Sequence, residues 1–506
     1  MFQNLNLKLS NKILLVLGGF GLFFAGLGYY FGFVALSDII DDKIWEMKIL
    51  KEGTEQWKMF LKIPFPFTLK VHIFNVKNPE AVLQGAKPAL EEVGPFIYRV
   101  FKWKSEVKWD TPDEISYNDY QTYHFDKEAS GRHTEDDIVT VLNTPYLSML
   151  EKIEQIQPSM FEMIEPVLPA VFGENAGPFM QVKVGDYMFK GVKICEHEGG
   201  GGMVASMACK ELAKKVKSKE ARNMRIEGDT ILFANLHYKN NSRLGRHTIK
   251  SGIQKKQDTG TLIKYNEAPY TKKWKGEASI CNKIRGVTTI FPNKIRPDMT
   301  FDAFSEDVCR SMTLAFQRPD KVKGVNGLRF AVRNDTFDYS RQENQCFCTN
   351  KSKEALPDTG CLKNGICDLS TCTGGPVMLS FPHLLYADPE YIHGVEGLQP
   401  NQSKHETFVV LEPLSGFPLQ LAQRVQFNMF LRPIEGVTKL QNVTEALVPL
   451  LWIEQSTILD DRFIDMLNTK LFKTLKIATI IKWTVIISGV ACTILSLCLY
   501  IYKRCP

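Results

Sequence analysis

Cysteine has the most evident chemistry in this 506-residue chain, which contains twelve of them. Five lie close together in the sequence, and thiolates in such a cluster either bind zinc or oxidise to disulfides. The paired Cys-x-x-Cys spacing typical of zinc sites is absent, so we expect disulfides and no metal, with zinc as the less favoured alternative. The five are Cys346, Cys348, Cys361, Cys367 and Cys372.

Catalytic motifs are absent from the sequence. No G-x-S-x-G, H-E-x-x-H or Walker pattern occurs, and the nine histidines are scattered. The glycines at 199–202 do not form a phosphate loop, because no Gly-Lys-Ser/Thr follows them at the required spacing. A triad can still assemble from distant residues, but nothing supports one. We expect neither an enzyme nor a cofactor.

A methionine-rich apolar segment is the main candidate for binding a ligand. Its apolar residues recur at spacings of three and four, as on one face of a helix, although Pro166 and Pro169 should bend or break that helix. Such a stripe most often packs into a core, but methionine is also flexible enough to accept lipids of varied shape. The candidate lipid-contacting residues are Met160, Phe161, Met163, Ile164, Val167, Leu168, Val171, Phe172, Phe179 and Met180.

A run of basic residues follows between Lys210 and Arg225. The simplest interpretation is a solvated helix face, and the alternative is a surface that attracts acidic partners or lipid head groups. The net charge of the whole chain is only +6, and no basic run with interleaved stacking aromatics occurs. Nucleic acid is therefore not an expected partner.

Two uncharged apolar stretches, Ile13 to Leu36 and Trp483 to Tyr502, must position everything between them. Each is long enough to cross a bilayer as a helix. A cleaved signal peptide would have a shorter apolar core and a small-residue cleavage site, which Ser37-Asp38 does not provide. The chain is therefore expected to cross the membrane twice.

Basic residues near the two stretches predict their orientation. Lys8 and Lys12 precede the first stretch, and Lys503 and Arg504 follow the second, which places both termini in the cytoplasm. Lys482 opposes this assignment, but a lysine at a helix end can reach the interface. The expected order is a cytoplasmic stub (1–12), a transmembrane helix (13–36), one extracellular domain (37–482), a transmembrane helix (483–502) and a cytoplasmic tail (503–506).

The long loop between the spans is large enough for its own core. In an oxidising compartment its nine cysteines should form disulfides, and the odd number leaves at least one thiol free or paired between chains. All five glycosylation sequons fall within this loop, as an extracellular location predicts. They are at Asn240, Asn334, Asn350, Asn401 and Asn442.

Both strands and helices are indicated within the loop. Alternating apolar residues at 69–73 and 425–431, and the aromatic and β-branched stretch from Phe96 to Trp103, predict strands. Thr144-Pro145 resembles a helix start, with an apolar face continuing to Ile156.

Several local patterns occur together in one order along the chain. They are Glu52-Gly53-Thr54 with Trp57, Phe74 to Pro79, Val93 to Arg99, Asp307 to Ser311, Cys346 to Cys348, Phe381 to His383, Gly397 to Asn401, Glu412-Pro413 and Leu451-Trp452. Together they resemble the class B scavenger receptor family over nearly the whole chain. Pro64 to Pro66 and Ala387 to Pro389 are most similar to the insect sensory neuron membrane proteins within it.

The resemblance implies an α+β fold, with an antiparallel barrel-like core, an internal hydrophobic tunnel and helices at about 144–225 forming a membrane-distal apex. It also implies three disulfides: Cys281 with Cys346, Cys309 with Cys372, and Cys348 with Cys361. Cys195 and Cys209 lie close enough for a loop-closing bond, which leaves Cys367 as the odd thiol.

The function implied is a plasma-membrane lipid receptor or transfer protein of chemosensory cells, which delivers ligands such as pheromones to the membrane or to an odorant receptor channel. Alternatives are a general scavenger receptor for lipoproteins or other lipids, and an adhesion glycoprotein with a solid core. Receptor-type relatives carry apical lysines where this chain has Gly173 to Gly177. Neutral ligands are therefore expected, unless the 210–225 helix supplies charge.

Two smaller expectations concern the membrane segments. Gly28 and Gly32 form a G-x-x-x-G pair that could join the first spans of a homodimer, although glycine is also common in membrane helices generally. Cys505, at the cytoplasmic edge, is a candidate for S-palmitoylation.

Overall fold

The computed structural model describes residues 11–196 and 202–504 and divides into two compact units. One unit contains the terminal segments, up to Lys48 and from Leu459, and the other runs from Ile49 to Ile458. Lys8 and Cys505 lie outside the described residues. The contribution of Lys8 to the orientation and the palmitoylation of Cys505 therefore stay predictions.

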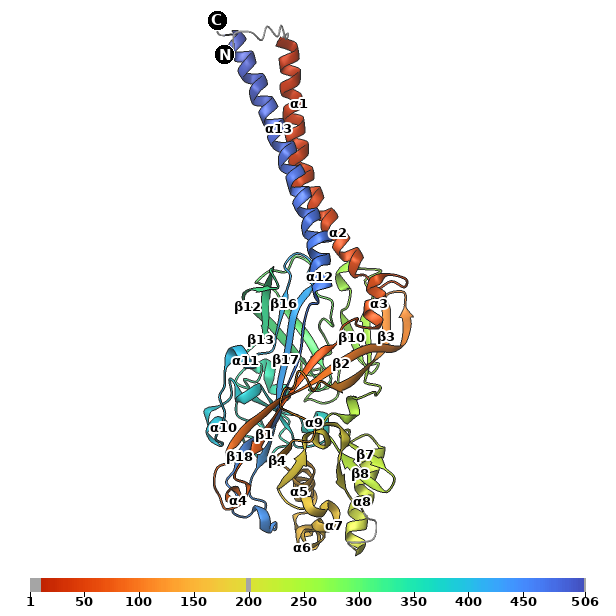
Figure 1. Ribbon diagram of the computed structural model, residues 1–506, viewed down its shortest axis with the longest axis vertical. Helices are drawn as coiled ribbons and strands as arrows, with labels where there is room; N and C mark the ends of the chain where they lie inside the picture. Colours follow the sequence, from red (N-terminus) through yellow and green to blue (C-terminus); the bar gives the residue numbers. More distant parts are fainter. Residues whose placement is uncertain (1–10, 197–201, 505–506) are drawn as a thin grey trace. The chain divides into compact units, whose positions relative to one another are not determined.

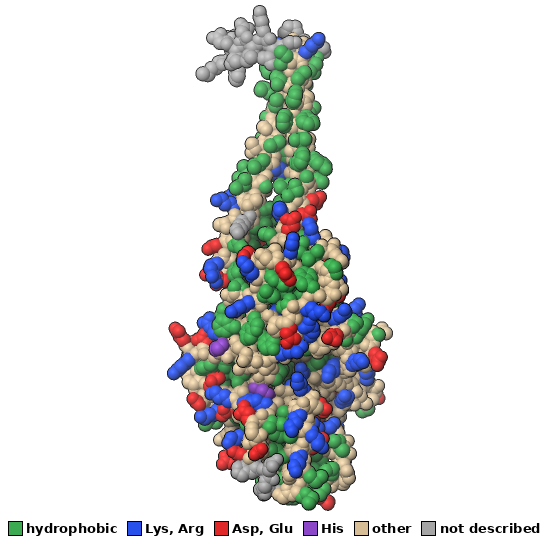
Figure 2. All heavy atoms as spheres, turned by 90° about the vertical axis from the view of Figure 1, so that its right-hand side faces the viewer, with side chains coloured by type: hydrophobic (Ala, Val, Ile, Leu, Met, Phe, Trp, Pro, Cys, Tyr) green, Lys and Arg blue, Asp and Glu red, His purple; other side chains and the backbone are tan. Residues whose placement is uncertain are grey.

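The terminal unit is a pair of long helices that lie side by side, with their chain ends together (Figure 1). Each is apolar and long enough to cross a membrane, and Figure 2 shows the apolar side chains that cover them. Both continue beyond the apolar stretches seen in the sequence, and each contains one π-helical turn. The segments are α1 (Asn11–Tyr30), η1 (Phe31–Ala35), α2 (Leu36–Lys48), α12 (Asp461–Met466), η11 (Leu467–Phe472) and α13 (Lys473–Arg504).

Glycines on α1 form its contact with α13. A Cβ added at Gly28 would lie 2.9 Å from Val485 Cγ1, and one added at Gly21 would overlap Thr493. Glycine thus lets the two backbones approach closely, as in other membrane helix pairs. The glycine face of α1 therefore packs against the second helix of the same chain.

Lys482 also packs in this contact. Its ammonium lies 4.0 Å from the centre of the Phe33 ring, and its methylene groups occupy the space that a side chain at Gly32 would fill. The lysine is thus accommodated by an aromatic ring at one end of the apolar stretch. The orientation of the helices stays a prediction.

The large unit is built on a nearly closed antiparallel sheet of thirteen strands, which confirms the α+β fold. Along the sheet the order is β10-β9-β3-β2-β1-β18-β17-β16-β13-β12-β11, and β15 joins β14 to β17. The strands are β1 (Phe67–Val76), β2 (Leu90–Thr111), β3 (Glu114–Phe125), β9 (Arg246–Lys250), β10 (Leu262–Tyr265), β11 (Thr300–Ser305), β12 (Arg310–Val322), β13 (Val325–Val332), β14 (Ile366–Asp368), β15 (Met378–Ser380), β16 (Phe408–Leu411), β17 (Pro418–Leu431) and β18 (Ala446–Ile458). Strands were expected within β1, β2 and β17, and all three are confirmed.

A helical bundle with two small sheets occupies one end of this unit (Figure 1). Its members are β4 (Ile138–Leu142), α5 (Thr144–Ile156), α6 (Phe161–Ile164), α7 (Leu168–Phe172), β5 (Phe179–Lys183), β6 (Val192–Ile194), α8 (Gly202–Lys217), β7 (Met224–Glu227) and β8 (Thr230–Phe233). Asn143 caps α5 by accepting a hydrogen bond from the Tyr146 N–H at 3.2 Å, so the cap lies one residue before the expected Thr144. Pro166 and Pro169 lie where the helix is broken into short turns, as predicted.

Short helices elsewhere in the unit connect the strands. They are α3 (Glu55–Leu61), α4 (Pro79–Val82), α9 (Ser370–Thr373), α10 (Pro389–His393) and α11 (Gln402–His405).

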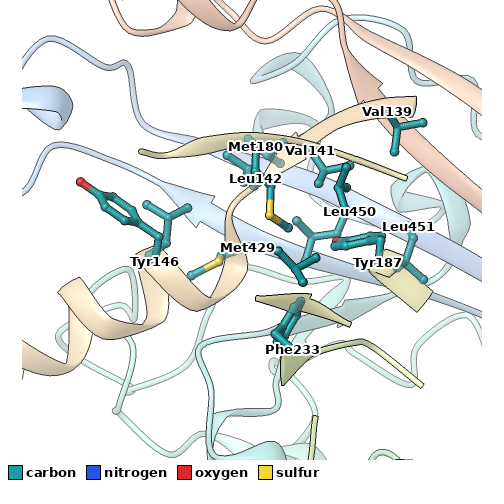
Figure 3. Packing of buried hydrophobic residues seen from close by; sticks show 14 of the residues in the cluster. Val139, Val141, Leu142, Tyr146, Met180, Tyr187, Phe233, Met429, Leu450 and Leu451 are labelled. Atoms are coloured by element: carbon teal, nitrogen blue, oxygen red, sulfur yellow. The ribbon is translucent and has the colours of Figure 1, made fainter. Parts of the chain in front are cut away.

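One hydrophobic core joins the bundle to the sheet (Figure 3). Tyr146 from α5 and Met180 from β5 pack in the same cluster as Met429 from β17 and Leu450 from β18. Burying each large apolar side chain stabilises the fold by about 1.5 to 3 kcal/mol. The bundle is therefore part of the same folded domain as the sheet.

Four disulfides cross-link the large unit. Cys281 is bonded to Cys346, Cys309 to Cys372, Cys348 to Cys361 and Cys195 to Cys209. These are the pairs expected from the resemblance and from the spacing of Cys195 and Cys209. Cys367 is free and buried, so it is the odd thiol of this unit. Because four members of the five-cysteine cluster are in disulfides, the zinc alternative is excluded.

Candidate functional site

The ten candidate ligand residues lie in the bundle and its sheet, but most of their side chains face inward. Met160, Val167 and Phe179 are partly buried against the main core, and Met163 is 53 % exposed. The remaining six are buried in the core: Phe161, Ile164, Leu168, Val171, Phe172 and Met180. Packing therefore accounts for most of the methionine-rich stripe, and only Met163 presents a largely free apolar surface.

A larger exposed apolar surface lies on α8, which the sequence analysis did not single out. Met203 and Met207 are 80 % and 63 % exposed. Lys210, Lys214 and Lys217 continue the same exposed face of the helix, at spacings of three and four. We call these five residues the α8 stripe. It is apolar near the start of the helix and basic near its end, and the spacing could have been found in the sequence.

Strand β2 has an unusual inversion of polarity. Phe96, Tyr98 and Val100 are buried in the main core, and we call the face that they share the inner face of β2. Because side chains alternate along a strand, Lys102 and Lys104 belong to the same face. The aromatic neighbours Phe101 and Trp103 belong to the opposite face, where Phe101 is 41 % exposed.

Pairing with β3 places other polar residues beside these lysines. Lys102 lies opposite Gln121 and Lys104 opposite Asp119, whereas Val100 lies opposite Tyr123. The inner face of β2 therefore changes from apolar at Val100 to charged at Lys102, the next residue on that face. Nearby, Lys239 forms an ion pair with Asp307.

Lys104 and Lys102 have different partners, although they are two residues apart. The Lys104 ammonium lies 3.4 Å from the Asp119 carboxylate, and 4.9 Å from the ring centres of Phe60 and Tyr117. The Lys102 ammonium lies 4.9 Å from the centre of the Phe67 ring. Among the described residues, no hydrogen bond or ion pair joins it to an acidic side chain.

Electrostatics at Lys102 reflect this position. Burial lowers the pKa of Lys102 to about 8, against an opposing effect of Asp119 and a further lowering by Lys239. The residue as a whole is nevertheless only half-buried, so part of it stays accessible to solvent. Lys102 is thus a desolvated cation without a neutralising partner in direct contact.

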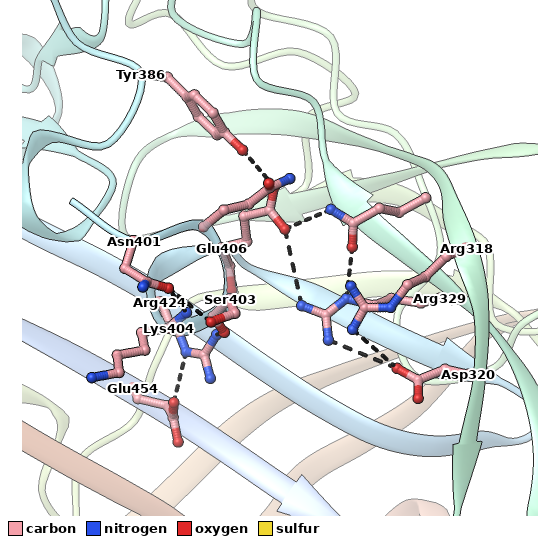
Figure 4. Close-up of polar contacts among 12 residues, drawn as sticks. Arg318, Asp320, Arg329, Tyr386, Asn401, Ser403, Lys404, Glu406, Arg424 and Glu454 are labelled. Carbon is pink, nitrogen blue, oxygen red and sulfur yellow. Dashed lines mark hydrogen bonds and ion pairs between the residues drawn. The ribbon is translucent and has the colours of Figure 1, made fainter.

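A second charged cluster, on the opposite face of the sheet, is fully paired (Figure 4). Arg424 lies 2.6 Å from Glu454, and Lys70 contacts the same carboxylate at 2.9 Å. Glu406, in the segment that follows α11, accepts hydrogen bonds from Tyr386 and Gln317, both at 2.6 Å. We call these six residues, with Arg329, the outer network.

The contacts with Lys70 and Arg424 lower the pKa of Glu454. Burial alone would raise the pKa of this carboxyl, but hydrogen bonds from Lys70 and Arg424 lower it to about 2. Each charge of this pairing therefore has a direct partner, which is what a structural role requires.

Histidines adjoin the outer network. The His383 ring lies parallel to the His405 ring at 4.4 Å between centres, and its Nε2 lies 2.7 Å from Glu92. Burial and the neighbouring His383 lower the pKa of His405 to about 4. These rings pack against each other and against Glu92.

The five sequon asparagines are all exposed, at positions 240, 334, 350, 401 and 442. Their glycosylation stays a prediction.

One long apolar helix precedes the β-rich domain in the sequence and a second follows it. This order defines a membrane protein with a large domain between its two spans. The chain belongs to the CD36 family, whose sequence profile matches residues 19–500. This confirms the family that the sequence motifs indicated.

Similar proteins include insect sensory neuron membrane proteins. The chain is 30 % identical to Sensory neuron membrane protein 2 of Drosophila melanogaster, over 97 % of this chain and 98 % of that protein. It is 31 % identical to Sensory neuron membrane protein 1 of Manduca sexta, over 91 % and 86 %. It is also 31 % identical to Sensory neuron membrane protein 1 of Apis mellifera, over 90 % and 85 %.

Proposed function

We propose that this chain is a receptor and transfer protein for hydrophobic ligands, such as lipid pheromones, in the plasma membrane of insect chemosensory cells. The helical bundle captures the ligand, a tunnel through the barrel shields it, and the ligand leaves at the bilayer or at an odorant receptor channel. Both termini are cytoplasmic and the domain between the spans is extracellular. Family membership and the sensory neuron membrane proteins it resembles support this proposal.

The observation that carries the proposal is the exposed apolar end of the α8 stripe. Met203, Met207 and Met163 leave more than half of their side-chain surface free, on the same helical bundle. Exposed apolar surface of this kind typically marks an interaction site, and methionine adapts to varied shapes. A long-chain ligand that leaves water gains about 0.8 kcal/mol per buried CH₂, so capture needs no catalysis.

Photo-crosslinking of the full chain in nanodiscs tests this capture step. A long-chain ester that carries a diazirine should label peptides of the bundle, as read by mass spectrometry. The double variant Met203→Gln, Met207→Gln should lower this labelling several-fold, because it removes the apolar surface. Ile253→Gln is the matched control, since Ile253 is 47 % exposed but lies outside the bundle. Absence of labelling anywhere in the 49–458 unit would overturn the proposal.

The basic end of the α8 stripe favours a second candidate. Lys210, Lys214 and Lys217 would attract anionic particles, which suits a general scavenger receptor for lipoproteins. Transcripts confined to olfactory neurons would support the chemosensory function, whereas strong expression in gut would support the scavenger.

The homodimer proposed through the first span must use a surface other than the glycine face. Gly21 and Gly28 already contact α13, whereas Phe20 and Phe23 are 58 % and 60 % exposed. If the first spans do associate, Phe20→Leu with Phe23→Leu should weaken crosslinking between copies more than Gly19→Leu, a substitution at an open position of α1.

A further inference from the structure

We propose that Lys102 is a head-group subsite inside the barrel, which selects amphiphiles with a carboxylate or another anionic oxygen over neutral ones. The subsite rests on the proposed tunnel, since its ligand must reach the inner face of β2. It places a cation inside the sheet domain, whereas the lysines of the α8 stripe lie on the surface of the bundle.

The first support is the placement of the lysine. Strand alternation puts Lys102 on the inner face with Tyr98 and Val100, and its pairing with Gln121 of β3 gives it a neutral neighbour there. A sequence that only needed a folded core would place Phe101 or Trp103 inward and the lysine outward. The chain does the opposite at this point.

The second support is the contrast with the neighbouring cations. Lys104 and Lys239 each have a carboxylate in direct contact, Asp119 and Asp307 respectively. Asp119 is also 3.4 Å from His247, so its negative charge is already shared between two other groups. A partly desolvated ammonium without a partner is costly, and an anionic ligand would supply the missing charge.

Apolar side chains flank the lysine and would receive the alkyl chain. Val100 and Tyr98 follow it along the strand in one direction, and the Phe67 ring lies beside its ammonium. In the other direction Tyr117 belongs to a separate apolar cluster around Ile115. A head group at Lys102 would therefore leave its chain against apolar side chains on either side.

The subsite changes the expected ligand chemistry. The bundle lacks lysines at Gly173 to Gly177, which suggested neutral ligands. The cation lies within the sheet domain instead, so a neutral ester and a carboxylate could share the entrance but would differ in retention.

Binding of cis-parinaric acid and of its methyl ester to the full chain in nanodiscs tests the inference. The two fluorescent probes share one alkyl chain and differ only in the charge of the head group. Lys102→Met should weaken binding of the acid about ten- to a hundredfold and leave the ester unchanged. Lys102→Arg should retain most of the affinity for the acid.

Lys108→Met is the matched control. Lys108 is on the same strand, but its side chain is 71 % exposed, so both probes should bind this variant as they bind the original chain. Equal loss of acid and ester binding in Lys102→Met, or no loss of either, would overturn the subsite. Neither result would contradict the proposed function, because the original chain would still bind both probes. Binding of neither probe to the original chain would instead overturn the proposed function.

A measurement on the unaltered chain covers the case in which Lys102→Met does not fold. An amine-reactive reagent at pH 8 should acylate Lys102, and mass spectrometry should show that the acid protects it at least several-fold better than the ester does. Equal protection by the two probes would contradict the preference for an anionic head group.

Discussion

The inner face of β2 and the outer network bury the same kinds of residues with opposite results. In the outer network Arg424 and Lys70 both contact Glu454, and Glu406 accepts hydrogen bonds from Tyr386 and Gln317. On the inner face Lys102 has an aromatic ring beside it and no acidic partner among the described residues. Buried charge alone therefore does not distinguish a structural cluster from a site. What distinguishes them is whether each charge is already neutralised.

The comparison also separates two kinds of energetic consequence. Removing one member of a buried pair leaves its partner uncompensated and destabilises the fold. Removing a charge that has no partner leaves nothing behind, so the fold is spared and only ligand binding suffers. The following substitutions test this distinction through the free energy of unfolding.

The largest effect is expected for Arg424→Met. The substitution leaves Glu454, whose side chain is 8 % exposed, with Lys70 and the Ser456 hydroxyl, and it removes the hydrogen bond to the Glu406 carbonyl. We expect a loss of about 3 to 5 kcal/mol in urea unfolding of the full chain. Arg296→Met is the control, because the Arg296 and Asp298 side chains are both more than 60 % exposed, and it should change stability by less than about 0.5 kcal/mol. A similar small effect of Arg424→Met would remove the basis of the comparison.

Much of this fold was accessible from the sequence. The alternation at Leu69 and Val71 predicts β1, and the helical spacing that ends at Ile156 predicts α5. Motif order gave the family, and with it three of the disulfides. These signals are local, or they are carried by residues with distinctive chemistry, such as a cysteine pair.

The sequence did not show which face of β2, or which side of the helical bundle, is available to a ligand. Alternation shows that Lys102 and Phe101 point to opposite sides, but it does not show which side is the interior. The usual preference for buried aromatics would choose the wrong face here. Likewise, the helical spacing around Met163 did not reveal which residues face out, because the proline-broken turns wrap their apolar side chains around the core.

Lys104→Met should have the next largest effect on stability. It leaves Asp119 with only the His247 contact at 3.4 Å and removes the contacts with Phe60 and Tyr117. The expected loss is about 2 to 3 kcal/mol. The double variant Lys104→Met, Asp119→Leu should recover part of it, because neither member of the ion pair then remains. A double variant no more stable than Lys104→Met would show that the ion pair is not the cause.

The lowered pKa of His405 predicts a pH-dependent change of similar size in the free energy of unfolding. Its pKa is about 4 in the folded chain, below the ordinary value of 6.5, because of burial and the nearby His383. The unfolded chain therefore takes up a proton first as pH falls, and stability is lost between pH 6.5 and 4. At pH 5 this amounts to about 2 kcal/mol relative to pH 7.

The measurement for His405 compares unfolding at pH 7 and pH 5 in the original chain and in His405→Gln. The variant lacks the titrating group, so its loss on acidification should be smaller by about 2 kcal/mol. The other ionisable groups are common to the two chains, so the comparison isolates the contribution of His405. Equal losses in the two chains would mean that His405 is not held neutral by its surroundings.

Lys102→Met should have the smallest effect on stability, and of the opposite sign. In the ligand-free chain the substitution removes a desolvated ammonium, keeps the apolar stem of the side chain, and leaves no carboxylate without its contact partner. Unfolding should require between zero and about 1 kcal/mol more free energy than in the original chain. Saturating cis-parinaric acid should stabilise the original chain but not the variant, since only a ligand that binds the folded state raises its stability. A loss above about 2 kcal/mol without ligand would place Lys102 with Arg424 and Lys104 as a structural cation, because such a loss requires a partner that the substitution left uncompensated.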